Sequence, residues 1–335
     1  MSDKVAVIGA GSWGTTVAAL IAANVPTMLW ARDPELASAI HRRHANPRYL
    51  WDVELPAGLG ATCEVDEAVA GVSLVVMAVP SHGFRAVAEE LAGALAAGIP
   101  VVSLTKGLER GSQLRMTEVL GQMLPDSPSG VLTGPNLASE VAAGQPTAAV
   151  VALDDEGTAR WVQGLMMSRT FRVYTSVDVT GCEIAGALKN VLAVAAGVCD
   201  GLGFGDNTRA AMITRGLAEM GRLGVALGGD RMTFAGLAGV GDLVATCTSP
   251  RSRNRTVGVA LGRGRTLDDI LGEMTMVAEG VKTARPMVEL AASYDVEVPI
   301  ASQVADLLDG VRSPAEAIAA LMDRPATSEF PRPLP

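Results

Sequence analysis

The sequence contains few aromatic residues and few cysteines, and each shortage excludes a class of protein. Only 4% of the 335 residues are aromatic, so a surface that stacks nucleic-acid bases on ring faces is not expected. The net charge of −9 also opposes a protein that coats nucleic acid. The four cysteines form no CxxC pair, which argues against a disulfide framework or a metal site and fits a reducing cytoplasm. They are Cys63, Cys182, Cys199 and Cys247.

Histidine is equally scarce and occurs only early in the chain, as His41, His44 and His82. A histidine base in the second half is therefore excluded. The N-terminus lacks a charged-then-apolar leader, and no window is expected to reach the roughly 18–20 apolar residues of a membrane span. The most apolar stretch, 184–199, is interrupted by Lys189 and Asn190. It predicts a buried helix with a functional lysine, in a cytoplasmic protein that does not span a membrane.

The first half of the sequence alternates short apolar runs with helical stretches. Strands are expected at residues 4–8, 27–30, 73–79, 101–105, 130–133, 147–153 and 171–174. Helices are expected at 14–23, 35–44, 112–124 and 155–167, with Ser112 as the N-cap of the third. This alternation is typical of a parallel sheet with right-handed crossovers. Residues 1–178 are therefore predicted to form a Rossmann-type, doubly wound α/β domain that binds a dinucleotide.

After residue 178 the strand patterns disappear and helical patterns replace them. Helices are expected at 180–199, 207–227, 252–262, 278–293, 300–309 and 314–322. Pro286 would start or kink one of them. Residues 179–325 are thus predicted to form an all-helical domain for substrate binding and catalysis. The Pro-rich segment 326–335 is predicted to be a frayed tail.

Residues 9–14 read Gly-Ala-Gly-Ser-Trp-Gly and match GxGxxG between the first strand and the first helix. In this position the motif predicts a dinucleotide site: Gly9 allows a tight turn, Gly11 a close approach to the pyrophosphate, and Gly14 close helix packing. Past the second strand, Arg32 stands where a 2′-phosphate would bind, whereas Asp33 would serve the ribose of NAD if the register differs by one. NADPH is therefore favoured and NADH is possible; a plain surface role for Arg32 stays open.

Two lysines are the candidates for the proton donor that ketone reduction needs beside a hydride. Lys189 lies in an apolar helix, where its charge is costly unless it is paired or its pKa is depressed. The alternative is a lysine that extends along apolar surface to reach solvent. Lys106 follows a predicted strand, at the sheet edge where ligands bind. Its alternative is a solvated loop lysine.

A glycine cluster at 236–241 is followed by Asp242 and, further along, by Ser252-Arg253-Asn254 at a predicted helix start. Amide groups at a helix start and a guanidinium fork are what phosphate recognition requires. The five arginines at 251, 253, 255, 263 and 265 could instead form a nucleic-acid patch. That alternative lacks interleaved aromatics and opposes the net charge.

Together these segments resemble the bacterial NAD(P)-dependent glycerol-3-phosphate dehydrogenases, over nearly the whole chain from Val5 to about Leu321. The resemblance implies reversible NAD(P)H-dependent reduction of dihydroxyacetone phosphate to sn-glycerol 3-phosphate. It also implies a homodimer that supplies glycerol phosphate for phospholipid synthesis. The most specific stretches are 9–15, 105–109, 134–135, 140–144, 186–222 and 239–254, with Asp-Gly-Leu-Gly-Phe-Gly-Asp-Asn-Thr-Arg-Ala-Ala at 200–211 the most distinctive.

The resemblance further implies roles for individual residues. Lys189 would donate and accept the proton, Asp242 would lie beside it, and Lys106 would touch both cofactor and substrate. The implied substrate contacts are Lys106, Gly134, Asn136, Lys189, Asn190, Asp242, Thr246, Ser252, Arg253 and Asn254. The implied cofactor contacts are Gly9, Gly11, Ser12, Trp13, Gly14, Arg32, Lys106, Ala138, Arg253, Val277 and Glu279. The family more often has Ser or Thr where Asn136 stands.

Two alternatives share parts of this pattern. A β-hydroxyacid or 6-phosphogluconate type of dehydrogenase has the same general plan with a lysine, but the block 239–254 argues against it. A protein that senses NADPH without turnover would bind the cofactor and oxidise none of it. The set of Lys189, Lys106 and Arg253 argues for catalysis instead.

Overall fold

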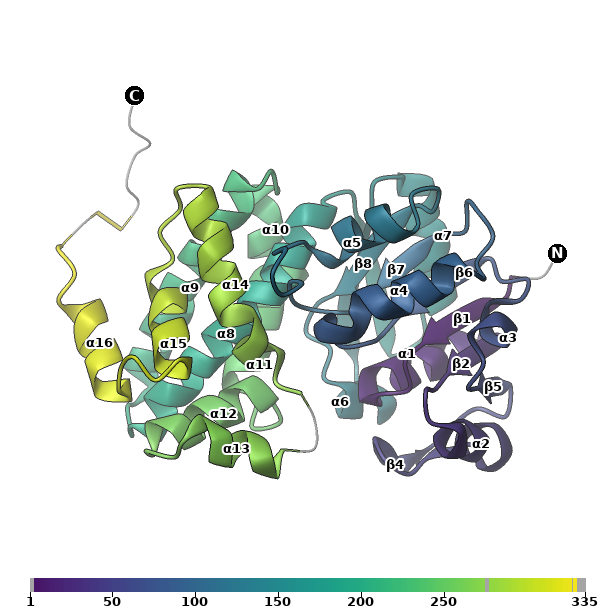
Figure 1. The fold of residues 1–335 in the computed structure, drawn as a ribbon, viewed down its shortest axis with the longest axis horizontal. Coiled ribbons are helices and arrows are strands. Elements are labelled where there is room, and N and C mark those ends of the chain that lie inside the picture. The colour runs from purple at the N-terminus through teal and green to yellow at the C-terminus, as the bar shows by residue number, and fades with distance from the viewer. Residues whose placement is uncertain (1–2, 275–276, 327, 330–335) are drawn as a thin grey trace.

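The computed structural model describes residues 3–274, 277–326 and 328–329. Two lobes lie side by side along the long axis: one contains the sheet, and the other is helical and ends at α16 (Pro314–Met322) (Figure 1). The predicted architecture, a doubly wound α/β unit followed by an all-helical one, is confirmed. The exact boundary after residue 178 stays a prediction. The expected tail 326–335 lies outside the described residues except at 326, 328 and 329.

An eight-stranded sheet forms the centre of the first lobe, in the order β10-β9-β8-β7-β6-β1-β2-β5. From β8 to β5 in that order, all neighbouring strands are parallel. Strand β9 runs antiparallel to β8, and β10 runs parallel to β9. The expectation of a parallel sheet is therefore wrong at this edge, because the connection from β8 through α6 (Ala138–Ala142) returns to the neighbouring position and β9 runs in the opposite direction. The strands are β1 (Val5–Ile8), β2 (Thr27–Trp30), β5 (Leu59–Thr62), β6 (Leu74–Met77), β7 (Val101–Ser103), β8 (Ser129–Thr133), β9 (Thr147–Leu153) and β10 (Phe171–Ser176).

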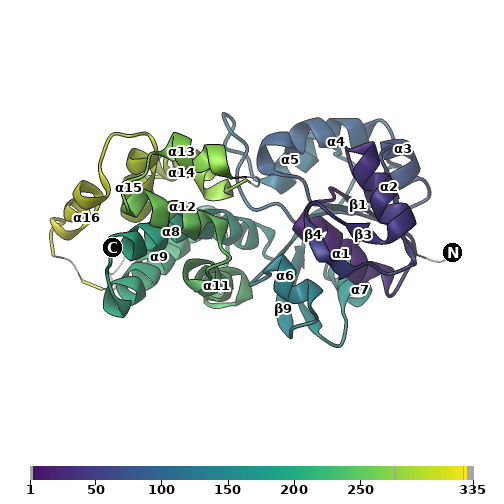
Figure 2. The same ribbon diagram turned by 90° about the horizontal axis from the view of Figure 1, so that it is seen from below.

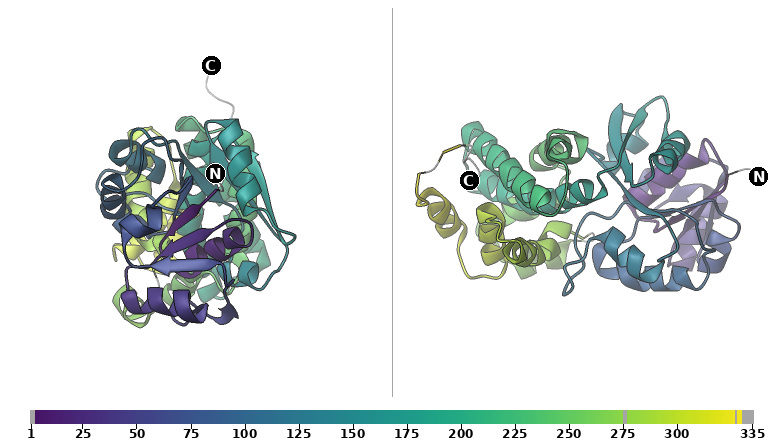
Figure 3. Two further views of the ribbon diagram at one scale, coloured as in Figure 1. Left: turned by 90° about the vertical axis from the view of Figure 1, so that its right-hand side faces the viewer. Right: turned by 90° about the horizontal axis from the view of Figure 1, so that it is seen from above.

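Helices cover both faces of this sheet, as the view along the long axis shows (Figure 3, left). Alternate residues of β1 enter different apolar clusters: Val5 and Val7 enter one, Ala6 and Ile8 the other. The sequence patterns missed β5, α3, α4, α6 and a hairpin of β3 (Ala45–Asn46) with β4 (Leu50–Glu54). The helices are α1 (Ser12–Ala22), α2 (Pro34–Arg43), α3 (Val65–Val69), the 3-10 turn η1 (Ser81–Gly83), α4 (Phe84–Ala92), α5 (Met116–Met123), α6 (Ala138–Ala142) and α7 (Glu156–Met166).

Helix α5 begins later than the sequence predicted, so the proposed N-cap at Ser112 is wrong. Gln113 has a φ of 62°, in the left-handed region, and a helix cannot run through it. The Ser112 hydroxyl instead donates to Glu109, at 2.5 Å. The amide of Arg115 donates to the Glu118 carboxylate at 2.8 Å, which closes the actual N-terminus one turn further on.

The second lobe is helical throughout: among its described residues beyond Ser176, no residue lies in a strand. The six expected helices are present, with Pro286 in the interior of α14 rather than at its start. Short α10, α11, α13 and a π-helical turn were not predicted. The elements are α8 (Val179–Gly201), α9 (Asp206–Ala226), α10 (Arg231–Ala235), the π-helix η2 (Leu237–Gly241), α11 (Asp242–Thr248), α12 (Arg253–Gly262), α13 (Leu267–Glu273), α14 (Glu279–Ser293), α15 (Pro299–Leu308) and α16.

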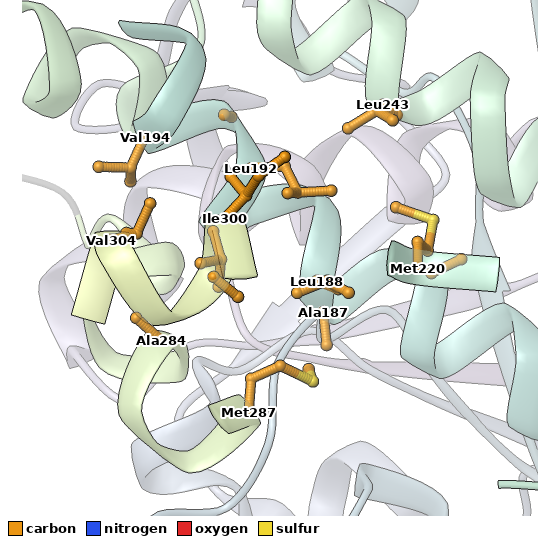
Figure 4. Packing of buried hydrophobic residues seen from close by; sticks show 14 of the residues in the cluster. Ala187, Leu188, Leu192, Val194, Met220, Leu243, Ala284, Met287, Ile300 and Val304 are labelled. Carbon is orange, nitrogen blue, oxygen red and sulfur yellow. The ribbon is translucent and has the colours of Figure 1, made fainter. Parts of the chain in front are cut away.

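Helix α8 is the centre of this lobe, surrounded by α9, α11, α12, α14 and α15. Its apolar side chains, including Leu188 and Leu192, pack among Met220, Met287 and Ile300 (Figure 4). By length and hydropathy α8 could cross a membrane, so the expectation that no segment reaches that composition is wrong. However, 94% of its most apolar window is buried inside the protein. That burial is typical of a core helix.

Helices α8 and α12 approach so closely that glycine is required between them (Figure 2). A Cβ atom at Gly258 would lie 2.0 Å from the carbonyl oxygen of Val194. Another at Gly197 would lie 2.1 Å from the carbonyl oxygen of Arg255. This approach brings the first turn of α12 beside the middle of α8, where the polar residues of that helix lie.

Candidate active site

Lys189 is buried in the middle of α8, with 6% of its surface exposed. Its Nζ atom donates to Oδ1 of Asp242 at 2.5 Å and to Oγ1 of Thr246 at 2.8 Å. Both partners lie on α11, one turn apart, so a single short helix presents both oxygens. The ammonium does not reach solvent along an apolar face, and that alternative for Lys189 is wrong.

Asp242 joins Lys189 to the second lysine of the site. Its Oδ2 atom accepts a hydrogen bond from Nζ of Lys106 at 2.7 Å, and Lys106 also donates to the carbonyl oxygen of Gly134 at 3.1 Å. The Lys106 side chain is 16% exposed and that of Asp242 2%. Lys106 is therefore a tethered side chain rather than a solvated loop lysine. Two cations share one buried carboxylate, so the cluster carries one net positive charge.

The burial of this cluster changes the pKa of its members. Burial lowers the pKa of Lys189 to about 8, partly offset by the Asp242 charge and reinforced by the Lys106 charge. Burial acts to raise the pKa of Asp242, but the two ammonium groups together bring it below its ordinary value. Lys189 can thus exchange a proton near neutral pH while Asp242 stays ionised.

The ends of neighbouring strands position Lys106. The Thr105 hydroxyl, two residues past β7, donates to the carbonyl oxygen of Val79, past β6, at 2.6 Å. Gly134, which follows β8, accepts from Lys106. The carboxyl ends of three adjacent parallel strands therefore meet at the lysine, the edge at which such sheets bind ligands.

A chain of side-chain amides connects this cluster to the start of α12. The Asn254 amide donates to Oδ1 of Asn190 at 2.9 Å, and Oδ1 of Asn254 accepts from the Gly280 backbone at 2.9 Å. Asn190 in turn donates to the carbonyl oxygen of Gly186 at 3.3 Å. Because Asn190 follows Lys189 directly, the first turn of α12 is fixed relative to the lysine.

The start of α12 has the features of an anion site. Ser252 is its N-cap and accepts a hydrogen bond from the Arg255 amide at 3.3 Å. The exposed Arg253 donates to the carbonyl oxygen of Val277 at 2.8 Å, which engages one of its five N–H donors. Three other arginines of the segment form ion pairs with carboxylates: Arg251 with Glu140, Arg255 with Asp200, and Arg265 with Glu273. These pairings do not favour a nucleic-acid patch.

Several buried polar atoms near Lys106 have no hydrogen-bond partner within the described part of the chain. They are the Thr133 hydroxyl, both amide atoms of Asn136 and the Thr283 hydroxyl. A Cβ atom at Gly186 would lie 3.3 Å from the Thr133 hydroxyl and 3.4 Å from Lys106 Cγ, so these groups adjoin. Buried polar groups need partners, and a polar ligand beside Lys106 would supply them. Sequence reasoning missed Thr133, although its place at the end of β8 was a signal.

The glycine motif forms the turn that the sequence predicted. Gly9 has a φ of +118°, and a Cβ atom at Gly14 would lie 2.0 Å from the Gly9 carbonyl oxygen. Gly11 is the N-cap of α1 and has open space where its side chain would be. Neither a capping side chain nor an acidic residue occupies the first turn of α1. These features fit a dinucleotide phosphate at the helix N-terminus.

Three other expected cofactor residues make contacts that the structure describes. Trp13 packs its ring edge-on against Phe171, with ring centroids 6.2 Å apart. Ala138 begins α6, and its carbonyl oxygen accepts from Thr16 of α1 at 3.4 Å. Glu279, at the start of α14, accepts from the Ser81 hydroxyl of the first lobe at 2.6 Å. Ser81 was not expected from the sequence.

Comparison with known proteins gives one consistent result. Residues 4–159 match the model of the NAD-dependent glycerol-3-phosphate dehydrogenase N-terminus, and residues 178–319 match that of its C-terminus. The chain is 54% identical to "Glycerol-3-phosphate dehydrogenase [NAD(P)+] 2" of Sphingopyxis alaskensis, over 96% of this chain and 97% of that protein. It is 51% identical to the Thermobifida fusca enzyme, over 97% and 98%. The glycerol-3-phosphate dehydrogenase structure from Coxiella burnetii superposes with a TM-score of 0.92 at 37% identity, covering 96% and 99%.

Proposed function

The chain belongs to the NAD-dependent glycerol-3-phosphate dehydrogenase family, and from this membership we propose how its residues divide the reaction. It is an NAD(P)-dependent oxidoreductase that interconverts dihydroxyacetone phosphate and sn-glycerol 3-phosphate. The buried cluster of Lys189, Asp242 and Lys106 is the observation that supports the proposed roles. When bound, the nicotinamide supplies or takes the hydride at the substrate carbon.

Lys189 is the general acid for ketone reduction and the general base for alcohol oxidation. A ketone carbon that accepts a hydride leaves a negative oxygen, and that oxygen takes a proton from the Lys189 ammonium. With a pKa of about 8, the resulting amine recovers its proton from solvent, and it is also the base for the reverse reaction. Asp242 and Thr246 hold the Nζ atom in place through the two hydrogen bonds described above.

Lys106 stabilises the developing negative charge without giving up its proton. Its Nζ atom is fixed by Asp242 and by the carbonyl oxygen of Gly134, so little reorganisation is needed when charge develops beside it. Asn136 supports the same assignment because both of its amide atoms are buried and have no hydrogen-bond partner among the residues that the structure describes. Where the family more often has the hydroxyl of Ser or Thr, the Asn136 amide offers both a donor and an acceptor to the carbinol end of the substrate.

The substrate phosphate binds at the start of α12, on Ser252, Arg253 and Asn254. The guanidinium of Arg253 supplies a fork, and the helix N-terminus supplies amide dipoles. Asn254 uses one amide hydrogen on Asn190, which leaves the other for a phosphate oxygen. The Asn190–Asn254 bond then sets the phosphate at a fixed position relative to Lys189.

The glycine motif and its surroundings hold the dinucleotide, with NADPH preferred over NADH. Arg32, exposed just past β2, supports this preference because a guanidinium there attracts a 2′-phosphate. Replacing Arg32 with Asp is expected to raise the KM for NADPH far more than that for NADH. The further cofactor contacts that we propose are Gly9, Gly11, Ser12, Trp13, Gly14, Lys106, Ala138, Arg253, Val277 and Glu279.

At the level of the whole chain, residues 1–178 would bind the cofactor and residues 179–325 the substrate. We place the enzyme in the cytoplasm, as a homodimer that supplies glycerol phosphate for phospholipid synthesis. The four unpaired cysteines support a reducing compartment, and the family resemblance supports the rest.

Oxidation of NADPH, followed by absorbance, tests the substrate assignment. Dihydroxyacetone phosphate is expected to be reduced rapidly, and unphosphorylated dihydroxyacetone at least 10²-fold more slowly in kcat/KM, because charge-assisted phosphate contacts are lost. Equal kcat/KM values for the two ketones would contradict a phosphate site at the start of α12. NADPH binding with no oxidation would instead favour a sensor or another substrate.

A further inference from the structure

The loop between β3 and β4 is fastened to the glycine motif. Asn46 is fully buried, and its amide donates to the carbonyl oxygen of Ala10 at 2.9 Å and to Thr15 Oγ1 at 2.8 Å. In the other direction, the Ser12 hydroxyl donates to the carbonyl oxygen of Tyr49 at 2.9 Å. Residues 46–49 are therefore held against the turn that would receive the dinucleotide phosphates.

The end of β2 meets the same turn. Gly9 donates its amide to the carbonyl oxygen of Trp30 at 3.0 Å, so the chain leaves β2 directly beside the glycine motif. Arg32 and Asp33 follow two and three residues later. Three segments thus converge where the adenosine end of a dinucleotide binds in this fold: the glycine turn, residues 32–33 and residues 46–49.

Asp33 would ordinarily oppose NADPH in this place, because a carboxylate after the second strand accepts the ribose hydroxyl and repels a 2′-phosphate. Here it is engaged elsewhere. Its Oδ1 atom caps α2 by accepting from the amides of Glu35 at 2.9 Å and Leu36 at 3.4 Å. Its Oδ2 atom forms an ion pair with Nη2 of Arg48 at 2.9 Å. The hydrogen bonds from the Leu36 and Glu35 amides hold the Asp33 pKa below its usual value, so its charge is present at neutral pH.

We propose that Arg48 is a cofactor-specificity residue: it neutralises Asp33 and, together with Arg32, completes the cationic site for the 2′-phosphate of NADPH. The charges support this role. The charges of Arg32 and Asp33 alone cancel, whereas adding Arg48 leaves one net positive charge among these three side chains. One ion pair engages part of the guanidinium, whose side chain is 56% exposed, so other N–H donors are left for a phosphate oxygen. This inference rests on the proposed NADPH preference.

The test compares Arg48→Ala with the unaltered enzyme, using kcat/KM for NADPH and NADH and cofactor Kd by fluorescence titration. We expect both measures for NADPH to weaken about tenfold or more, with NADH changed less than threefold. Asp33→Asn added to Arg48→Ala should recover part of the NADPH affinity, since the uncompensated carboxylate is gone. If the double variant recovers no NADPH affinity, the proposal that Arg48 neutralises Asp33 is wrong. If it recovers all of the affinity, the proposed direct contact of Arg48 with the 2′-phosphate is wrong.

Arg42→Ala is the matched control, because it removes the same charge from an exposed position at the opposite end of α2. It should leave the NADPH to NADH ratio unchanged. Arg32→Ala, measured in parallel, separates this inference from the proposed preference. If Arg32→Ala abolishes NADPH selectivity and Arg48→Ala does not, the Arg48 role is wrong and the preference stands. If the unaltered enzyme binds both cofactors equally, the preference itself is wrong.

Discussion

The Nζ atom of Lys189 lies 2.5 Å from Oδ1 of Asp242, in an ion pair whose side chains are 7% and 2% exposed. The same carboxylate holds Lys106 through its other oxygen. A buried ion pair is weak evidence for a gain in stability, since desolvation offsets much of its attraction. Its arrangement is better explained by chemistry: one carboxylate keeps two cations at a fixed separation and leaves one of them able to exchange a proton.

Replacing Asp242 with Asn should lower kcat for dihydroxyacetone phosphate reduction by roughly 10²-fold or more at pH 7.5. Without the carboxylate, Lys106 and the buried surroundings lower the Lys189 pKa further, so its ammonium is depleted at that pH. Activity should partly return as the pH is lowered, which a pH profile of kcat measures. Asp206→Asn is the control, because that side chain is 94% exposed on α9. A pH profile with the same midpoint as that of the unaltered enzyme, at lower amplitude, would contradict the proposal that Asp242 controls the pKa of Lys189.

Replacing Arg253 with Ala should raise the KM for dihydroxyacetone phosphate by about 10- to 10²-fold, equivalent to ~1.5–3 kcal/mol for a charged hydrogen bond. The kcat should change much less, because the phosphate is bound equally in the ground and transition states. Steady-state kinetics at saturating NADPH measures both constants. Arg251→Ala, which removes a neighbouring arginine paired with Glu140, should have little effect. A fall in kcat without a change in KM would refute the phosphate assignment.

Glu219 predicts a pH dependence of stability that is separate from catalysis. Burial raises its pKa to about 7, although the amides of Ile300 and Ala301 donate to it. The folded state thus keeps a proton that the unfolded chain releases near pH 4.5, so the contribution of Glu219 to stability is lost as the pH rises from about 4.5 through 7. The loss attributable to this group is about 3 kcal/mol. In Glu219→Gln that part of the fall in Tm should disappear; an unchanged slope would exclude Glu219 as its source.

Replacing Gly258 with Ala should destabilise the protein by about 1–3 kcal/mol, because overpacking forces α12 away from α8. The added Cβ would lie 2.0 Å from the Val194 carbonyl oxygen. Gly272→Ala is the matched control: it also lies in a helix, α13, but has open space around it. That change should be neutral or slightly stabilising. Denaturant unfolding measures both, and equal effects would show that the close helix contact has no cost.

The sequence predicted best what depends on local pattern. The bounds of α8 and α9 follow from continuous helical periodicity, and the glycine turn follows from its motif and position. The prediction of Ser112 as a cap was wrong because Gln113 adopts a left-handed conformation, which no local sequence pattern indicated. The antiparallel direction of β9 was not predicted, because alternation of strands and helices does not specify whether a connection that contains a helix crosses the sheet.

The site required contacts between residues far apart in the chain. From spacing alone, Lys189 and Lys106 were separate candidates, and nothing local indicated that Asp242 would bind both. Their meeting depends on α11 packing against α8 at the edge of the sheet. Asn46 and Arg48 were missed for the same reason. Their short hairpin has no strong strand pattern, and its proposed role depends on its contact with the glycine motif, which is distant in the sequence.

The pH dependence of kcat in the two reaction directions, compared between the unaltered enzyme and Lys189→Met, tests whether Lys189 exchanges the proton with the substrate. Lys189 must be charged to reduce the ketone and neutral to oxidise the alcohol. With its pKa at about 8, kcat for reduction should fall above that pH and kcat for oxidation should rise. Lys189→Met should lose at least 10²-fold of kcat in both directions, with NADPH binding by fluorescence intact. A variant that turns over at a near-normal rate, or parallel pH profiles in the two directions, would show that the proton passes through another group.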